Sequence, residues 1–156
     1  MKSLETDSKK AKKPVVVATC GGFDPLHAGH VRLFKEAKKL GDKLVIILNG
    51  DDWLKRKKGF IFMNEEERKE ILLALEPVDD VVIHDAGVVH VAGALLDLKP
   101  DILAKGGDRN QSEVPIPPEE VAACEEIGCE IVYNVGGSKI QSSSWLIGKA
   151  KEADNR

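Results

Sequence analysis

The chain is organised around the stretch Val15-Val-Val-Ala-Thr-Cys-Gly-Gly-Phe-Asp-Pro-Leu-His-Ala-Gly-His30. It begins with a continuous apolar run, which is typical of a strand buried on both faces, and the residues after it have helical spacing. A helix N-terminus presents unpaired N–H groups and a partial positive charge, so the histidines at this junction lie where an anion is best held. Gly21 and Gly22 have no Cβ and allow the backbone to approach a ligand.

Length and composition favour one domain with an ordinary hydrophobic core. The chain has 156 residues and a formal net charge of −3, which is too close to neutral for binding nucleic acid by overall charge. No apolar run approaches the ~20 residues that span a bilayer, and we expect no secretory signal because no hydrophobic segment follows the first lysines. We expect a cytoplasmic protein without membrane or nucleic-acid partners, with a disordered basic tail at 1–13 and a domain at 14–156.

Beyond the opening stretch, apolar runs alternate with segments of helical spacing. Further strands are expected at 43–48, 78–83, 101–104 and 130–133, and helices at 30–40, 64–75, 90–98, 118–127 and 142–151. The basic stretch 53–59 is interpreted as a flexible segment. This alternation predicts a Rossmann-like three-layer α/β sandwich, with a five-stranded parallel sheet and helices on both faces.

Ligands of such sheets bind beyond the carboxyl ends of the strands, where the strand order switches. Polar segments follow the predicted strands at 21–30, 49–58, 105–109 and 136–144. The topology is therefore expected to gather these distant segments at one edge of the sheet.

The segment from Cys20 to His30 resembles the signature of the cytidylyltransferase-like nucleotidyltransferases. That family includes glycerol-3-phosphate cytidylyltransferase, heptose-1-phosphate adenylyltransferase and archaeal FAD synthetase. Companion motifs follow in the family's order: Asn64-Glu-Glu-Glu-Arg68, Lys105-Gly-Gly-Asp108 and Ser142-Ser-Ser144. The second of these looks most like the heptose-phosphate adenylyltransferase version. The family's Arg-Thr-x-Gly-Ile stretch is replaced by Gly136-Gly-Ser-Lys-Ile-Gln141, in which Lys139 stands in for the arginine, displaced by one place.

The resemblance implies that a phosphate monoester attacks the α-phosphorus of a nucleoside triphosphate and releases pyrophosphate. ATP is favoured over CTP, Mg²⁺ enters with the triphosphate, and the acceptor is a small phosphorylated sugar, polyol or alcohol. A homodimer is expected from the family. The alternative is a non-catalytic nucleotide-binding or sensor module on the same fold. RNA binding through the basic segments is disfavoured by the lack of aromatic platforms.

The resemblance also implies the site residues. Those expected to be catalytic are His27, His30, Lys57 and Arg68, which direct positive charge or hydrogen bonds at the phosphates. Those expected to bind the nucleotide are Gly21, Gly22, Phe23, Asp24, Gly29, Lys105, Gly106, Asp108, Lys139, Ser142 and Ser143. Those expected to bind the acceptor are Asp51, Trp53 and Lys55, and no metal held by the protein alone is expected.

Structural interpretations of the same residues stay open. The histidines are also suitable as loop and cap residues, and Asp24 either orders its loop or helps to hold Mg²⁺. The lysines near residue 57 belong to a lid over the phosphates or to a solvated charge run. Ser142 and Ser143 are natural N-caps, and Trp53 is equally suited to packing.

Overall fold

The computed structural model describes residues 13–107, 116–137 and 141–154, so the predicted tail lies almost entirely outside them. Five parallel strands form one sheet in the order β3-β2-β1-β4-β5, which confirms the predicted Rossmann-like α/β class. The strands are β1 (Val16–Gly21), β2 (Lys43–Asn49), β3 (Asp80–His84), β4 (Ile102–Gly106) and β5 (Glu130–Val135). The helices are α2 (Ala28–Lys38), α3 (Asp51–Lys58), α4 (Glu65–Leu73), α5 (Ala92–Leu98), α6 (Pro118–Ile127) and α7 (Ser143–Asp154).

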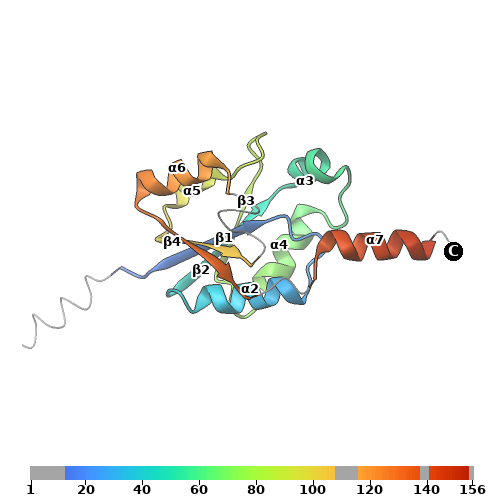
Figure 1. Cartoon of the computed structure of the whole chain (residues 1–156), viewed down its shortest axis with the longest axis horizontal. Coiled ribbons are helices and arrows are strands. Elements are labelled where there is room, and N and C mark those ends of the chain that lie inside the picture. Colours follow the sequence, from blue (N-terminus) through green and yellow to red (C-terminus); the bar gives the residue numbers. More distant parts are fainter. Residues whose placement is uncertain (1–12, 108–115, 138–140, 155–156) are drawn as a thin grey trace, which may run out of the picture.

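Helices cover both faces of the sheet (Figure 1). On one face, α2 and α4 bury Phe34 and Leu72 against alternate strand residues. On the other face, α5 and α6 bury Leu95 and Ala123 in a second core. A strand between two apolar layers buries successive side chains in opposite directions, and this explains the uninterrupted apolar runs of the sequence.

The sheet is built outward from its centre. The chain enters at β1, adds β2 and β3 on one side, and returns to add β4 and β5 on the other. Val17 of β1 lies in register with Leu44 of β2 and Ile102 of β4. The switch in strand order therefore falls between β1 and β4, and the carboxyl ends of these strands share one edge of the sheet.

Helix α6 begins and ends where the sequence predicts. Pro118 occupies its first turn, where a missing N–H costs nothing, and Gly128 ends it in a left-handed conformation with φ 71°. Helix α4 also begins at its predicted signal, because the Asn64 side chain accepts a hydrogen bond from Glu67 N at 2.8 Å.

The basic stretch after β2 differs from the prediction. It is the helix α3 and not a flexible segment, and Gly59 caps it with φ 86°. Leu54, fully buried, anchors this helix to the body of the protein, and Asp51 and Asp52 complement the positive end of its dipole. The buried Leu54 is thus one of the contacts that hold this charged segment as a helix.

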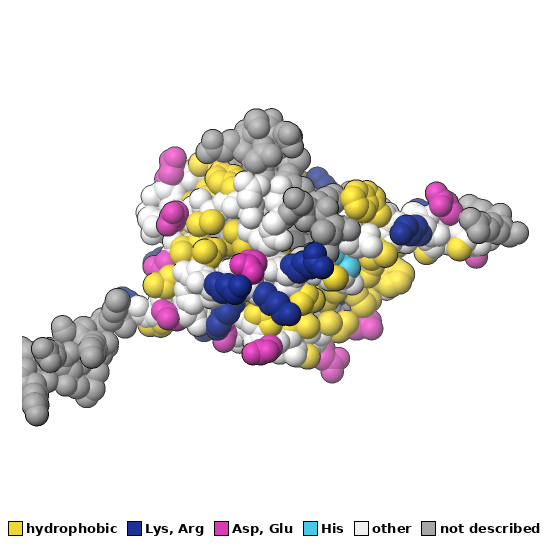
Figure 2. Space-filling model, turned by 60° about the horizontal axis from the view of Figure 1, so that its bottom comes forward, with side chains coloured by type: hydrophobic (Ala, Val, Ile, Leu, Met, Phe, Trp, Pro, Cys, Tyr) yellow, Lys and Arg dark blue, Asp and Glu magenta, His cyan; other side chains and the backbone are white. Residues whose placement is uncertain are grey.

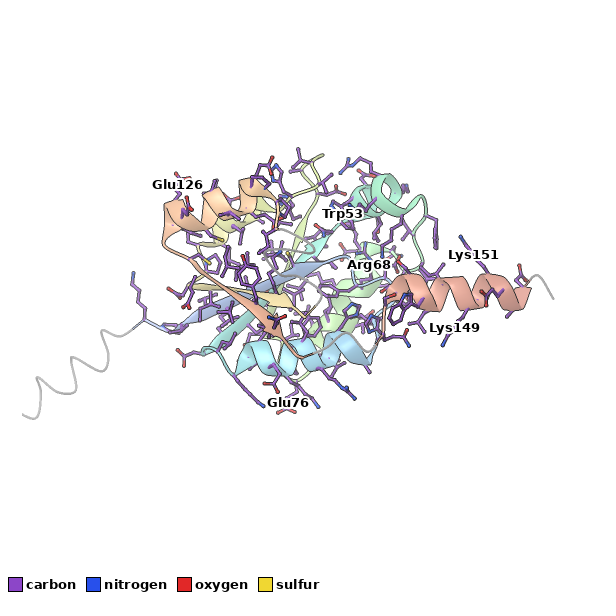
Figure 3. All side chains as sticks on the ribbon, in the orientation of Figure 1. Trp53, Arg68, Glu76, Glu126, Lys149 and Lys151 are labelled. Carbon is purple, nitrogen blue, oxygen red and sulfur yellow. The ribbon has the colours of Figure 1, made fainter. Side chains whose placement is uncertain are left out.

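Helix α7 projects from the body of the domain (Figure 1). Lys149 and Lys151 lie along it (Figure 3), and Lys151 Nζ lies 5.5 Å from the ring centroid of Phe60. Large hydrophobic side chains reach the surface in this region, as the space-filling view indicates (Figure 2). Among the helices of the described ranges, none has the length and hydropathy of a membrane span.

Candidate active site

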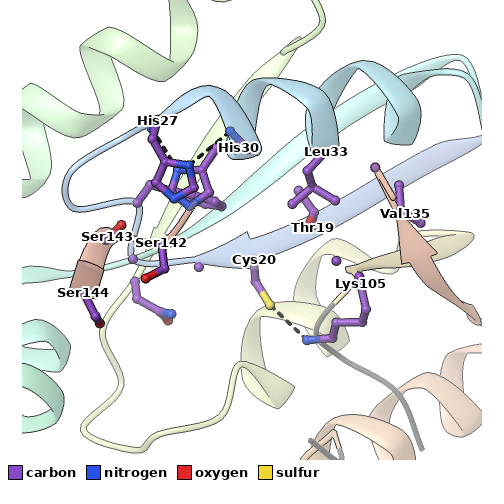
Figure 4. Close-up of a pocket in the computed structure, with 18 of the residues that line it drawn as sticks. Thr19, Cys20, His27, His30, Leu33, Lys105, Val135, Ser142, Ser143 and Ser144 are labelled. Carbon is purple, nitrogen blue, oxygen red and sulfur yellow. Dashed lines mark hydrogen bonds between the residues drawn. The ribbon is translucent and has the colours of Figure 1, made fainter. Parts of the chain in front are cut away.

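A cavity of about 500 Å³ opens at the carboxyl ends of the strands (Figure 4). Its lining draws on all four polar segments that the topology was expected to gather: His30 after β1, Lys57 after β2, Gly106 at the end of β4 and Ser142 before α7. The predicted convergence of these segments is confirmed. Most of the site residues predicted from the sequence line the cavity. Among the described residues, the exceptions are Asp24, Asp51, Lys55 and Arg68.

The two histidines cap the helix that follows them. His27 is the N-cap of α2, and its Nδ1 accepts a hydrogen bond from Gly29 N at 3.1 Å. His30 Nδ1 accepts in return from His27 N at 3.3 Å. A ring nitrogen that accepts carries no hydrogen, so each neutral ring has its N–H on Nε2. The cap interpretation and the ligand interpretation are therefore compatible, because they use opposite edges of the imidazoles.

The rings of His27 and His30 are stacked, with centroids 3.7 Å apart and planes at 26°. The Phe23 ring meets His30 edge-on, with a centroid distance of 4.8 Å. Burial, the neighbouring His27 and the charge of Lys58 together lower the pKa of His30 to about 3. His30 is thus a neutral hydrogen-bond donor at physiological pH. Phe23, which the resemblance implied for nucleotide binding, serves here as the apolar support of that ring.

The N-terminus of α7 completes this side of the cavity. Ser142 Oγ accepts from Trp145 N at 3.0 Å and caps the helix. Ser143 Oγ donates to Pro25 O at 2.8 Å and ties α7 to the histidine loop. The N-termini of α2 and α7 therefore meet around the imidazoles (Figure 4), and their dipoles favour an anion between them.

Arg68 does not lie where a phosphate contact requires it. Its side chain is fully buried and outside the cavity lining. It donates four hydrogen bonds, to Met63 O at 2.9 Å, Gly22 O at 2.7 Å, Asn49 O at 2.7 Å and Asp51 Oδ1 at 2.8 Å. Arg68 thus fastens the ends of β1 and β2 to α3 and α4. Arg68 and Asp51 thus pair with each other outside the cavity lining, and their expected contacts with phosphate and acceptor stay predictions.

Asp24 has a loop-ordering role. It is 2% exposed, and its carboxylate accepts from Phe62 N at 2.6 Å and Met63 N at 2.7 Å. Within the described ranges, no group of three or more His, Cys, Asp or Glu side chains is arranged to hold a metal. The Asp24 side chain also lies outside the cavity lining.

Helix α3 presents only some of its predicted residues to the cavity. Lys57, Lys58 and Trp53 line it, whereas Lys55 does not. Burial lowers the pKa of Lys58, Asp24 raises it and Arg68 lowers it further, with a net downward shift. Trp53 donates from Nε1 to Val89 O at 2.9 Å, which links α3 to the loop before α5.

Lys105 lies inside β4 and not in a loop. Its ammonium contacts Glu120 Oε1 at 3.0 Å and Cys20 Sγ at 3.3 Å (Figure 4). Burial opposes the charged form, but Cys20 and Glu120 outweigh it and raise the pKa of Lys105. Cys20, Glu120 and Asn49 also line the cavity, although none of them was among the predicted site residues. The signal for Cys20 lay in the register, because the pairing of Val17 with Ile102 brings Cys20 opposite Lys105.

Glycines form the edge of the cavity at β4 and β5. Gly106, Gly107 and Gly137 line it, together with Gly136. Gly136 has φ 87°, and a Cβ there would lie 2.9 Å from Leu33 Cα, so no larger residue fits. The remaining predicted glycines, Gly21, Gly22 and Gly29, also line the cavity. Asp108 and Lys139 fall outside the described residues.

The amino-acid sequence is similar to those of known proteins. The chain is 40% identical over 148 residues to the bifunctional protein HldE of Pelobacter propionicus, which covers 92% of this chain and 27% of that protein. It is 43% identical over 100 residues to the FAD synthase of Thermococcus sibiricus, covering 64% of this chain and 67% of that protein. The chain thus spans about a quarter of the length of the HldE relative.

A solved structure shares the fold. The crystal structure of the lipopolysaccharide core biosynthesis protein from Thermoplasma volcanium superposes with a TM-score of 0.64 at 29% identity, covering 83% of this chain and all of that one. The model of the cytidylyltransferase-like family matches residues 18–135, which include His27, His30 and all of the sheet except the first two residues of β1. The chain therefore belongs to the cytidylyltransferase-like family.

Proposed function

We propose that this protein transfers a nucleoside monophosphate from a nucleoside triphosphate to a small phosphate monoester and releases pyrophosphate. The observation that carries the proposal is the stacked pair of imidazoles between the N-termini of α2 and α7. An oxygen of the monoester forms a bond to the α-phosphorus, and the bond from that phosphorus to the bridging β-oxygen breaks. The electron pair leaves with the pyrophosphate.

This reaction needs little covalent help from the protein. It requires in-line positioning and positive potential where the phosphoryl oxygens gain charge. His27 and His30 supply N–H donors whose tautomers are set before the ligand arrives. The dipoles of α2 and α7 and the ammonium groups of Lys57 and Lys58 add positive potential on both sides of the imidazoles.

The position of the switch point supports a division of the cavity into two halves. The half at β4 and β5 has an edge of glycine backbone, including Gly106 and Gly136, which suits close approach of a base and ribose. The half at β2 carries Trp53 and Lys57, which suit a phosphorylated acceptor. His27 and His30 follow the central strand β1 and lie between the two halves. We assign the nucleotide to the first half and the acceptor to the second.

ATP is the favoured triphosphate. The Lys105-Gly-Gly-Asp108 sequence supports this choice, and so does the similarity to a protein named FAD synthase, since the FAD molecule contains an AMP unit. Mg²⁺ enters as part of the substrate, because Mg²⁺ usually keeps several waters and binds through the phosphates of a nucleotide. The family also supports a homodimer as the working assembly.

The direct test is pyrophosphate release from purified protein with Mg²⁺, each of ATP, CTP, GTP and UTP, and a panel of sugar, polyol and alkyl phosphates. We expect release with ATP and at least one ester, and slower release with CTP. Tight ATP binding by calorimetry without turnover on any ester would favour the nucleotide sensor instead. Lys43→Ala is a suitable control, because this exposed residue begins β2 at the opposite edge of the sheet.

A further inference from the structure

Two buried polar atoms of the described residues have no hydrogen-bond partner: Asn49 Oδ1 and His84 Nε2. Asn49 is 5% exposed, yet it lines the cavity. Buried polar atoms are nearly always paired, so each exception calls for an explanation such as an absent ligand. The proposed phosphate chemistry uses neither side chain.

These residues are neighbours on the sheet. Asn49 ends β2 and His84 ends β3, and the two are register partners in the parallel pair. In-register partners on adjacent parallel strands project to the same face, with backbones about 4.8 Å apart. That face is the one covered by α5, because Ile47, two residues before Asn49, belongs to the α5 core, and a Cβ on Gly93 of α5 would lie 3.6 Å from the His84 ring.

The carboxylates near Asn49 and His84 are paired with arginines, and this indicates that the ligand group is neutral. The carboxylates nearest in the sequence are already engaged: Asp51 with Arg68, and Asp85 with Arg56 and with Asp52 N. The amide oxygen of Asn49 can only accept a hydrogen bond, whereas a neutral imidazole nitrogen can donate. A hydroxyl group provides both a donor and an acceptor, and vicinal hydroxyls provide two of each. An apolar group in the cavity would leave Asn49 Oδ1 unpaired.

We propose that Asn49, which lines the cavity, forms a hydroxyl-recognition subsite for the acceptor, with His84 beside it on the neighbouring strand. Asn49 Oδ1 accepts from a hydroxyl of the acceptor, whereas His84 lies outside the cavity lining and is not assigned a contact with the acceptor. The subsite selects sugar and polyol phosphates over alkyl and aromatic phosphates. This inference rests on the proposed function, because it places the acceptor in the half of the cavity at β2.

The test uses pairs of esters that differ only in their hydroxyls: glycerol 3-phosphate with n-propyl phosphate, and inositol 1-phosphate with cyclohexyl phosphate. A site built to bind hydroxyls discriminates strongly against analogues that lack them, so we expect kcat/KM with ATP to favour at least one hydroxylated member by at least about tenfold. The near-isosteric Asn49→Leu removes the acceptor atom and should reduce this preference to within about threefold, while the KM for ATP changes by less than about twofold.

Asn49→Asp is the matched variant, since it keeps an acceptor oxygen and should retain more of the preference than Asn49→Leu. A preference that persists in Asn49→Leu, or that is absent from the wild type, overturns the subsite. A change in thermal stability alone, with the preference intact, means that a structural water occupies these atoms and also overturns it. Equilibrium binding of the same ester pairs in the presence of ATP separates this result from failure of the proposed reaction, because binding preference does not need turnover.

Discussion

Two regions of the cavity, the histidine pair at the N-terminus of α2 and the lysines of α3, are held in place in different ways. His27 and His30 are fixed by hydrogen bonds within their own four-residue segment, where each Nδ1 accepts from a backbone N–H. Helix α3 is positioned by remote contacts: Arg68 of α4 holds Asp51, and Trp53 bonds to Val89 before α5. One region is locally encoded, and the other depends on the tertiary fold.

Because the histidines are held locally and the lysines of α3 by remote contacts, the two regions should respond differently to substitution. A locally encoded cap survives changes elsewhere, so the imidazoles are oriented wherever α2 forms. The lysines of α3 reach the cavity only while α4 and the loop before α5 stay in position. Substitutions in the two regions should therefore separate loss of chemistry from loss of structure.

The largest effect is expected at the histidines. In His27→Asn and His30→Asn, the amide oxygen replaces Nδ1 as the acceptor of the capping bond, but no donor remains at the position of Nε2. Because the lost donors stabilise charge only as it develops, kcat should fall by about 10²–10⁴-fold. Pyrophosphate release measures the rate, and circular dichroism should show an unchanged melting transition. A variant that keeps near wild-type turnover would contradict the role of the imidazoles.

Arg68→Met should produce the second-largest effect, and it should act on the fold. The variant removes four donors and leaves buried carbonyls and the Asp51 carboxylate without partners. Breaking such a buried network costs about 3–5 kcal/mol, so the midpoint of urea unfolding should fall markedly. Lys69→Met, at the neighbouring position of α4, is the control. If Arg68→Met is as stable as the wild type but inactive, Arg68 contacts substrate after all.

The same contrast explains which parts of the site were predictable. The His-Ala-Gly-His spacing and the glycine and proline signals are local, so the histidine site and helix α6 follow directly from the residues. The role of Arg68 depends on which carbonyls the fold brings to it, and the motif alone suggested a phosphate. Asn49 and His84 become partners only through the register of β2 and β3, which no short pattern contains.

The neutrality of His30 gives a prediction about pH. Its pKa is lowered to about 3 by burial, by His27 and by Lys58, whereas the unfolded chain titrates near 6.5. Between these values the unfolded chain binds a proton that the folded protein does not, so acidification destabilises the fold. From pH 7 to pH 5, the wild type should lose about 1–2 kcal/mol more of its free energy of unfolding than His30→Asn does. An equal loss in both proteins, or an NMR titration of His30 near its ordinary pKa, would contradict this account.

The smallest effect is expected from a substitution of Trp53, which tests how helix α3 is positioned. Trp53→Phe keeps the aromatic surface toward the cavity but deletes the Nε1–H that bonds to Val89 O. A single neutral hydrogen bond contributes about 1 kcal/mol, so the fold should survive with a small loss of stability. If this bond positions α3 for the acceptor, the KM for the phosphate ester should rise about two- to fivefold while the KM for ATP stays unchanged, because the nucleotide is assigned to the opposite half of the cavity. Equal changes in both KM values would mean that the two halves are not separate. Trp145→Phe, on the exposed first turn of α7, controls for the general effect of replacing a tryptophan.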